Sequence, residues 1–458
     1  MRVHKKWVKP ETIFLGLAMI FGLAYAFLQP LFVESDSSFH FDYSAYIGHT
    51  VVDRASVGMP AEDYQSQPVA FMTVSQMKRD GTYYKNFFQT KLPRISRDKV
   101  VDKRVTLGSE NSVVSHIIPS IGVALGYILS PTIGSMVITA RVCSLLFFSI
   151  SLYGIIKHLK AYKGIFAAIS LTPTVIQHAT SLSYDCYNYV ASAFMIMVAI
   201  NSVITIQQEK EVRLGRVLFQ FVAPAILLFF AKKNAYLLYL MIPVILLYLW
   251  AKKTGVTWTK KQMYLCIAVG SVGLLGVLAV VIGDVSHFIW ALKRFFYTTL
   301  EPYYTVWTTE VIGGTTTAGL PAWFFPIQIL VLVLLYLSYR QEEVPRWFAW
   351  FGLALVLVNG VFIMVKYAIN PNFIDYSGRI ITGPQGRYFT PYLLLLAPSM
   401  TLLSRKITVT ATKSLYRLVV AVTVLALCLN LAEIYTRFYR LQLPADEYRS
   451  GIEHYIFK

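Results

Sequence analysis

The chain has 458 residues, of which 56% are hydrophobic and only 14% are charged, whereas a soluble domain carries about 25% charged residues. The net charge is +18, but the basic residues cluster in short loops between apolar blocks and form no basic and aromatic surface, which excludes a nucleic-acid partner. The four cysteines lie within or beside apolar blocks, so no disulfide framework or zinc site is expected.

The apolar residues form blocks close to the roughly 20 residues that a helix needs to cross a bilayer. The first block, 13–33, follows a basic segment and is predicted to be an uncleaved first span. Residues 34–116 are polar and predict a large loop. The block 117–130 is short for a span and predicts a membrane-dipping or interfacial helix. Ten further spans are predicted at 134–156, 164–182, 186–206, 216–231, 234–251, 262–283, 322–339, 346–367, 388–403 and 415–434.

These blocks predict an all-α integral membrane protein, a single polytopic domain (1–458) with about 11 transmembrane helices, because backbone in lipid must satisfy its own hydrogen bonds. The basic short loops favour a cytoplasmic N-terminus. Residues 34–116, 284–321, 368–387 and 435–458 are then expected outside the membrane.

Acidic residues beside the spans are candidates for chemistry, because ionisable groups near the membrane are costly. Asp36 and His40 follow the first span, where a carboxylate is suited to accept a proton from an acceptor hydroxyl. Asp185 lies in the tight turn before the span at 186–206. Each has a structural alternative: Asp36 begins a solvated loop or caps a helix, and Asp185 or Ser183 caps the following helix.

Basic and aromatic residues provide candidate binding groups for a phosphate. Lys232 and Lys233 interrupt an apolar stretch at the predicted outer face, and Arg387 with Tyr388 opens a late span, where an arginine fork suits a phosphate. The alternatives are snorkelling to lipid phosphates and interfacial anchoring. Arg141 lies inside a span, where it serves either substrate binding or helix packing. Tyr236 and Arg379 complete the candidates.

In order and spacing, these residues resemble a bacterial polytopic family of unknown function that is similar to the GT-C glycosyltransferases. The resemblance spans about residues 14–430. It rests on Asp36 with His40, Pro119 with Arg141, Pro173 with Ser181-Leu182-Ser183-Tyr184-Asp185, Lys233 with Tyr236, and Gly386-Arg387-Tyr388-Phe389. The chain departs from the family where Ser37 replaces the second acid of an Asp-Glu pair and Asn234-Ala235 replaces a Pro-Pro pair.

The resemblance implies a GT-C-like bundle in a bacterial cytoplasmic membrane. It also implies an inverting transfer of a sugar from a polyprenyl-phosphate or polyprenyl-diphosphate donor to an envelope glycopolymer, glycolipid or protein. Asp36 would act as the base, with Asp185 as a second catalytic acid, and Lys233 and Arg387 would stabilise the departing phosphate. A divalent cation, Mg²⁺ or Mn²⁺, shared by Asp36 and Asp185 is left open.

Other functions fit parts of the same pattern. A transporter or flippase of lipid-linked saccharides needs phosphate-binding cations but no adjacent carboxylate. A polysaccharide polymerase also has many spans, but its large loop lies late in the chain. A non-catalytic assembly scaffold predicts that Asp36→Asn is silent.

Overall fold

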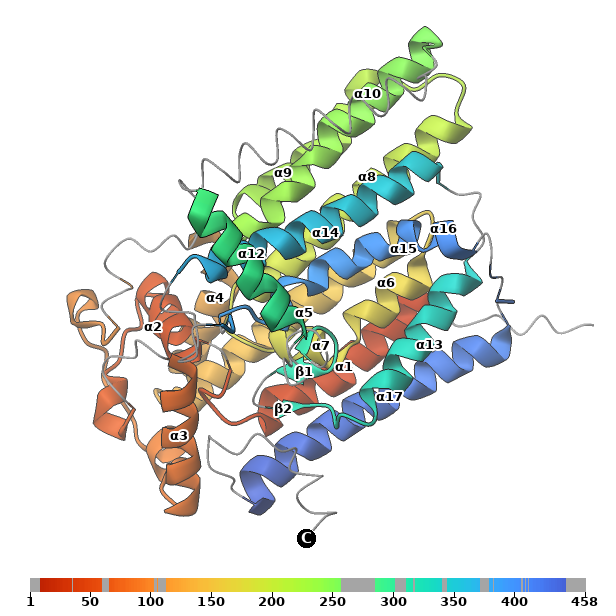
Figure 1. The fold of residues 1–458 in the computed structure, drawn as a ribbon. Helices are drawn as coiled ribbons and strands as arrows, with labels where there is room; N and C mark the ends of the chain where they lie inside the picture. Colours follow the sequence, from red (N-terminus) through yellow and green to blue (C-terminus); the bar gives the residue numbers. More distant parts are fainter. Residues whose placement is uncertain are drawn as a thin grey trace, which may run out of the picture.

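The computed structural model describes residues 9–34, 36–59, 66–102, 105, 113–256, 285–300, 310–315, 318–339, 344–370, 379–381, 383–404, 407, 409, 410 and 412–441. Long helices lie roughly side by side in one bundle, and α2 and α3 lie at one end of it (Figure 1). The longest are α1 (Pro10–Leu28), α5 (Ile133–His158), α8 (Asp185–Gln208), α14 (Arg346–Ala368) and α17 (Lys413–Tyr435).

Six helical segments are long and apolar enough to cross a membrane: 10–28, 133–158, 185–208, 233–254, 346–368 and 413–441. They coincide with predicted spans, so a mainly helical protein with several helices of membrane-spanning length is confirmed, while the count of 11 stays a prediction. Shorter apolar helices include α4 (Val113–Leu129), α9 (Leu214–Phe229) and α13 (Phe325–Ser338). The predicted span 262–283 lies outside the described residues.

Two predicted spans are broken helices. Pro173 divides 164–182 into α6 (Lys163–Ser170) and α7 (Pro173–Ala179), since proline starts a helix readily but cannot continue one. The span 388–403 is divided into η8 (Gly386–Tyr388), η9 (Thr390–Leu395), α15 (Leu396–Ser399) and α16 (Thr401–Ser404). In lipid such breaks are tolerated only where protein surrounds them, and both carry or adjoin residues of the candidate site.

Helix α4 packs along α5 through small residues. A Cβ added to Gly122 would lie 2.4 Å from Cα of Ala140, and one added to Gly126 would lie 2.5 Å from Cα of Met136. This spacing of two glycines four residues apart permits the close backbone approach found between membrane helices. The apolar block that begins near residue 117 is therefore one member of a tight helical pair, and this pairing fixes the position of His116.

The first large loop has its own helices. They are α2 (Ser37–Ile47), η1 (Arg54–Val57), α3 (Ser66–Arg79), η2 (Lys85–Gln89) and η3 (Arg97–Lys99). The buried carboxylate of Asp42 pairs with Arg54 at 3.0 Å and accepts the amide of Asp102 at 3.0 Å. Burial, only partly offset by Arg54, raises the pKa of Asp42 to about 6.

A short β-hairpin packs against α7 and α17, in the segment that the sequence predicted as the outer loop 284–321. Its strands, β1 (Gly314–Thr315) and β2 (Ala318–Gly319), are antiparallel. Thr174 accepts the amide of Gly314 at 2.8 Å, Gln177 accepts that of Thr315 at 2.8 Å, and Asn430 donates to the carbonyl of Ala318 at 2.8 Å. Side chains of α7 and α17 thus provide hydrogen-bond partners for this non-helical backbone, which would otherwise need water as its partner.

The remaining described helices complete the bundle. They are η5 (Lys233–Leu240), α10 (Met241–Thr254), α12 (Val285–Leu300) and η10 (Thr436–Leu441).

Candidate functional site: a charged cavity at one end of the bundle

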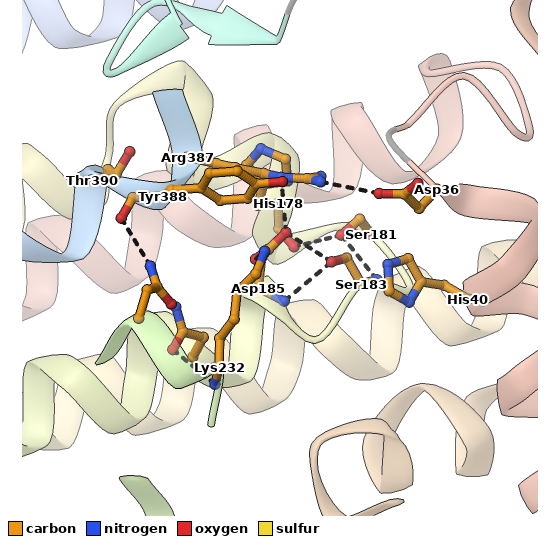
Figure 2. Close-up of polar contacts among 12 residues, drawn as sticks. Asp36, His40, His178, Ser181, Ser183, Asp185, Lys232, Arg387, Tyr388 and Thr390 are labelled. Carbon is orange, nitrogen blue, oxygen red and sulfur yellow. Dashed lines mark hydrogen bonds and ion pairs between the residues drawn. The ribbon is translucent and has the colours of Figure 1, made fainter. Parts of the chain in front are cut away.

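Side chains from four distant segments meet around Arg387 (Figure 2). Asp36 precedes α2, Asp185 begins α8, Lys232 lies between α9 and η5, and Arg387 is in η8. The fold therefore brings together residues that are up to 351 positions apart in the sequence. The predicted topology requires these segment ends to share one side of the membrane, and their convergence agrees with that requirement.

Asp185 is the buried centre of this group. Its carboxylate faces Nε of Arg387 at 3.2 Å and Nζ of Lys232 at 3.5 Å, and it accepts the hydroxyl of Ser183 at 2.9 Å. Ser183 in turn accepts the amide of Asp185 at 3.2 Å, so Ser183 rather than Asp185 bonds to the backbone at the start of α8. With 6% of its side chain exposed, Asp185 is an internal counter-charge that orients both cations.

Asp36 is much more accessible. Its side chain is 43% exposed and reaches Nη2 of Arg387 at 3.3 Å. Its backbone is left-handed, with φ 55°, and its carboxylate makes no capping hydrogen bond to α2. Aspartate tolerates this conformation better than most residues, and here it directs the carboxylate toward Arg387 (Figure 2). The geometry therefore does not match the predicted capping alternative.

Lys232 lies against aromatic rings and a carboxylate. Its Nζ is 3.9 Å from the ring centroid of Tyr388 and 4.9 Å from that of Tyr184. Burial acts to lower the pKa of Lys232, but the Asp185 carboxylate outweighs it and holds this pKa above its ordinary value. Lys232 is therefore a permanent positive charge at neutral pH.

His40 and His116 form a buried pair beside the charged group. Nδ1 of His40 lies 2.9 Å from Nε2 of His116, and the ring of Tyr184 meets both edge-on. Burial first, then His116, holds the pKa of His40 well below its ordinary value. His40 is therefore neutral, and its contact with His116 connects α2, which follows Asp36, to α4.

The position of Arg387 depends on Glu310 and on a glycine. The amide of Gly386 donates to Oε2 of Glu310 at 3.1 Å. A Cβ on Gly386 would lie 2.3 Å from the carbonyl carbon of Glu310 and 2.4 Å from the amide nitrogen of Val311. Only glycine fits this close approach, so the segment before the β-hairpin fixes the turn that carries Arg387.

A cavity of about 620 Å³ opens beside this group. Its walls contain the carboxylate of Asp36 and the hydroxyl of Ser115, with apolar residues that include Phe229 and Ile363. They also contain three lysines and four tyrosines: Lys232, Lys233, Lys366, Tyr184, Tyr236, Tyr367 and Tyr388. Three positive charges face one negative charge, which favours an anionic ligand, and the tyrosine rings offer faces for stacking. We call this space the charged cavity.

The structure brings most of the predicted site residues together, but not all of them. Tyr236 lines the charged cavity and donates its hydroxyl to the carbonyl of Phe229 at 2.8 Å. Arg379 is exposed and is not among the residues that line this cavity. Arg141 is directed to the end of α1, where it donates to the carbonyls of Ala26, Gln29 and Pro30 and pairs with Glu34. This contact set is that of a helix-packing arginine.

The two acids do not form a site for a shared divalent cation. Arg387 bridges them, and both oxygens of Asp185 already face cations or the Ser183 hydroxyl. Within the described ranges no three His, Cys, Asp or Glu side chains cluster with a geometry suited to a metal. The donor set therefore does not fit the Mg²⁺ or Mn²⁺ that the sequence left open.

Sequence reasoning missed three groups at this site. Lys366 lies at the end of a predicted span and was detectable as an ionisable residue near the membrane. His116 and Glu310 gave no usable signal, because each is one of many polar residues in a long predicted loop and its partner depends on the tertiary fold.

No curated protein and no solved structure matched the chain. The family described as predicted membrane protein (DUF2142) matches residues 19–396, and the chain belongs to this family of membrane proteins.

Proposed function

We propose that the charged cavity binds the sugar-phosphate head of a membrane lipid and that the protein transfers this sugar to an acceptor hydroxyl. The observation that carries the proposal is the placement of a half-exposed carboxylate, Asp36, in one cavity with three lysines and four tyrosines. A phosphate needs the cations, a sugar ring stacks on aromatic faces, and transfer to a hydroxyl needs a base.

In the proposed reaction, the acceptor oxygen forms a bond to the anomeric carbon while the bond from that carbon to the phosphate oxygen breaks. Asp36 takes the proton of the acceptor hydroxyl, and the phosphate leaves with the bonding electron pair. Lys232, with Lys233 and Lys366 on the same cavity wall, stabilises the negative charge that develops on the phosphate.

Asp185 acts in this proposal as a positioning residue. Its carboxylate is bonded on both oxygens and does not line the charged cavity, so it is not available to an acceptor. It instead holds Arg387 and Lys232 in place, and Arg387 in turn orients Asp36. This assignment differs from the sequence prediction that Asp185 is itself catalytic.

The carrier and the acceptor come from the sequence resemblance. It supports a polyprenyl-phosphate or polyprenyl-diphosphate donor, a GT-C-like bundle, and an envelope glycopolymer, glycolipid or protein as acceptor. It also supports a reaction on the outer face of a bacterial cytoplasmic membrane, with the N-terminus inside.

The test is to express Asp36→Asn in a deletion strain and to compare the sugar composition of purified envelope glycopolymers with wild type. Asp80→Asn is the matched control, because Asp80 is an exposed acid of the same loop that bonds only to Gln76 among the contacts described. We expect the deletion and Asp36→Asn to lose the same sugar at normal membrane abundance, while Asp80→Asn retains it. If the deletion loses a sugar that Asp36→Asn retains, Asp36 is not the base and a transporter or scaffold is favoured.

A further inference from the structure

A second cavity, of about 470 Å³, is lined in part by the stretch of α14 that precedes Ile363 and Lys366. Its walls are almost entirely apolar and come mainly from α13, α14 and η9, with Leu332, Val356, Gly360 and Phe389 among them. We call it the apolar cavity. Phe389 is two residues from Arg387, so the upper wall of this cavity adjoins the charged group.

The two cavities share one face of α14. Ile363 and Lys366 line the charged cavity, and Asn359 lines the apolar one. Steps of four and three residues keep these three side chains on one side of a helix. Seven residues at about 1.5 Å each place Asn359 about 10 Å along the helix axis from Lys366. A lipid with its head among the lysines can therefore extend down this face into the apolar cavity.

Asn359 is the polar exception in the apolar cavity. Its side chain is 1% exposed, and neither its amide oxygen nor its amide nitrogen has a hydrogen-bond partner within the described part of the chain. A buried amide without partners is costly and is uncommon in native proteins. Its position on the path from the lysines indicates that a ligand oxygen completes its hydrogen bonding.

We propose that the apolar cavity holds the hydrocarbon chain of the lipid whose anionic head occupies the charged cavity, and that Asn359 binds the oxygen joining head to chain. The inference rests on the anion site of the proposed function, but it requires no sugar transfer. The distance from Lys366 to Asn359 fits an extended head, such as a diphosphate or a sugar phosphate, better than a single phosphate.

Gly360 provides a way to block the apolar cavity. It lines the cavity, and a Cβ added to it would meet no atom within 4 Å, so the side chain of Gly360→Phe has room at its base. Gly154→Phe is the control, because Gly154 is also inside an apolar helix with nothing within 4 Å but does not line the apolar cavity. Folding of each variant is checked by size-exclusion chromatography and thermal unfolding.

The experiment measures binding of butyl phosphate, dodecyl phosphate and dodecyl diphosphate to the full chain in phosphatidylcholine nanodiscs. In wild type and Gly154→Phe we expect dodecyl phosphate to bind more than about tenfold more tightly than butyl phosphate, because burial of each methylene adds affinity. In Gly360→Phe the affinity for dodecyl phosphate should fall to that for butyl phosphate, and the affinity for butyl phosphate should stay unchanged. An unchanged ratio in Gly360→Phe would overturn the chain site.

Asn359→Leu tests the polar contact. We expect about three- to tenfold weaker binding of dodecyl diphosphate, with little change for dodecyl phosphate, because one hydrogen bond to a charged head is lost. Equal diphosphate binding by wild type and Asn359→Leu would overturn the role of Asn359. If chain-length dependence is present but Asp36→Asn leaves envelope sugars intact, the chain site stands and the proposed transferase does not.

Discussion

Two buried arginines, Arg141 and Arg387, have similar burial but opposite surroundings. Arg141 donates to three carbonyls at the end of α1 and pairs with Glu34. Arg387 is divided between Asp36 and Asp185, and its Nη1 has no hydrogen-bond partner within the described residues. The contacts of Arg141 hold helices together, whereas those of Arg387 hold a set of charges beside a cavity. Burial alone therefore does not separate a structural charge from a functional one.

The largest effect on stability is expected from Arg141→Leu. Removing one partner of a buried ion pair costs about 3–5 kcal/mol, because Glu34 is left with an uncompensated charge. The measurement is thermal unfolding of the detergent-purified protein together with its membrane abundance. Arg216→Leu is the control: its pair with Glu209 is exposed, so a cost of at most about 1 kcal/mol is expected. Equal losses in the two variants would refute the structural role of Arg141.

Arg387→Lys tests the opposite expectation, that transfer is lost more than stability. Lysine keeps the charge but cannot bridge two carboxylates with a planar fork. We expect sugar transfer to fall about 100-fold, because Asp36 loses its fixed position, with a smaller loss of stability than in Arg141→Leu. Transfer is measured as incorporation of the sugar into the envelope acceptor. If the Arg387→Lys protein is destabilised but still transfers sugar at the wild-type rate, Arg387 has the same structural role as Arg141.

Gly386→Ala tests whether the hairpin segment positions Arg387. The added methyl would overlap the backbone at Glu310 and Val311, and such overpacking costs about 1–3 kcal/mol. We expect lower transfer along with lower stability. Gly154→Ala serves as the comparison, because it meets no atom within 4 Å and should stabilise α5 by up to about 1 kcal/mol.

The smallest effect concerns the pH dependence of folding through His40. Because the pKa of His40 is lowered in the folded state, the unfolded chain binds more protons as the pH falls from about 6.5 toward the folded pKa. Stability contributed by neutral His40 is therefore present above that pH and is lost as the pH falls. We expect the wild-type unfolding midpoint to drop more between pH 7 and pH 5 than that of His40→Gln. Parallel drops would show that His40 does not contribute.

The helical architecture could be predicted because transmembrane helices are local. An apolar run of bilayer length is enough to place α1, α5, α8, α14 and α17. Individual charges such as Asp36, Asp185, Lys232 and Arg387 were also identified, since each is conspicuous beside apolar sequence. Their pairing could not be predicted, because it depends on contacts across as many as 351 residues.

The β-hairpin was not predicted for the same reason. No local pattern marks Gly314–Thr315 and Ala318–Gly319 as strands, because the groups that bond to this backbone are distant in sequence. Those groups are Thr174, Gln177 and Asn430. The role of Glu310 in fixing Gly386 depends on the fold of that same segment and was missed with it.

The most direct test of the account is native mass spectrometry of purified Asp36→Asn and Arg387→Gln proteins with their bound lipids. If the charged cavity holds a lipid-linked sugar and Asp36 is the base, Asp36→Asn retains the unreacted donor, and its mass identifies both sugar and carrier. Arg387→Gln removes one of the two cations that neutralise Asp185, so it should carry far less of this anionic donor. If the two variants carry the same lipids and none of these lipids is a sugar phosphate, the charged cavity is not a donor site.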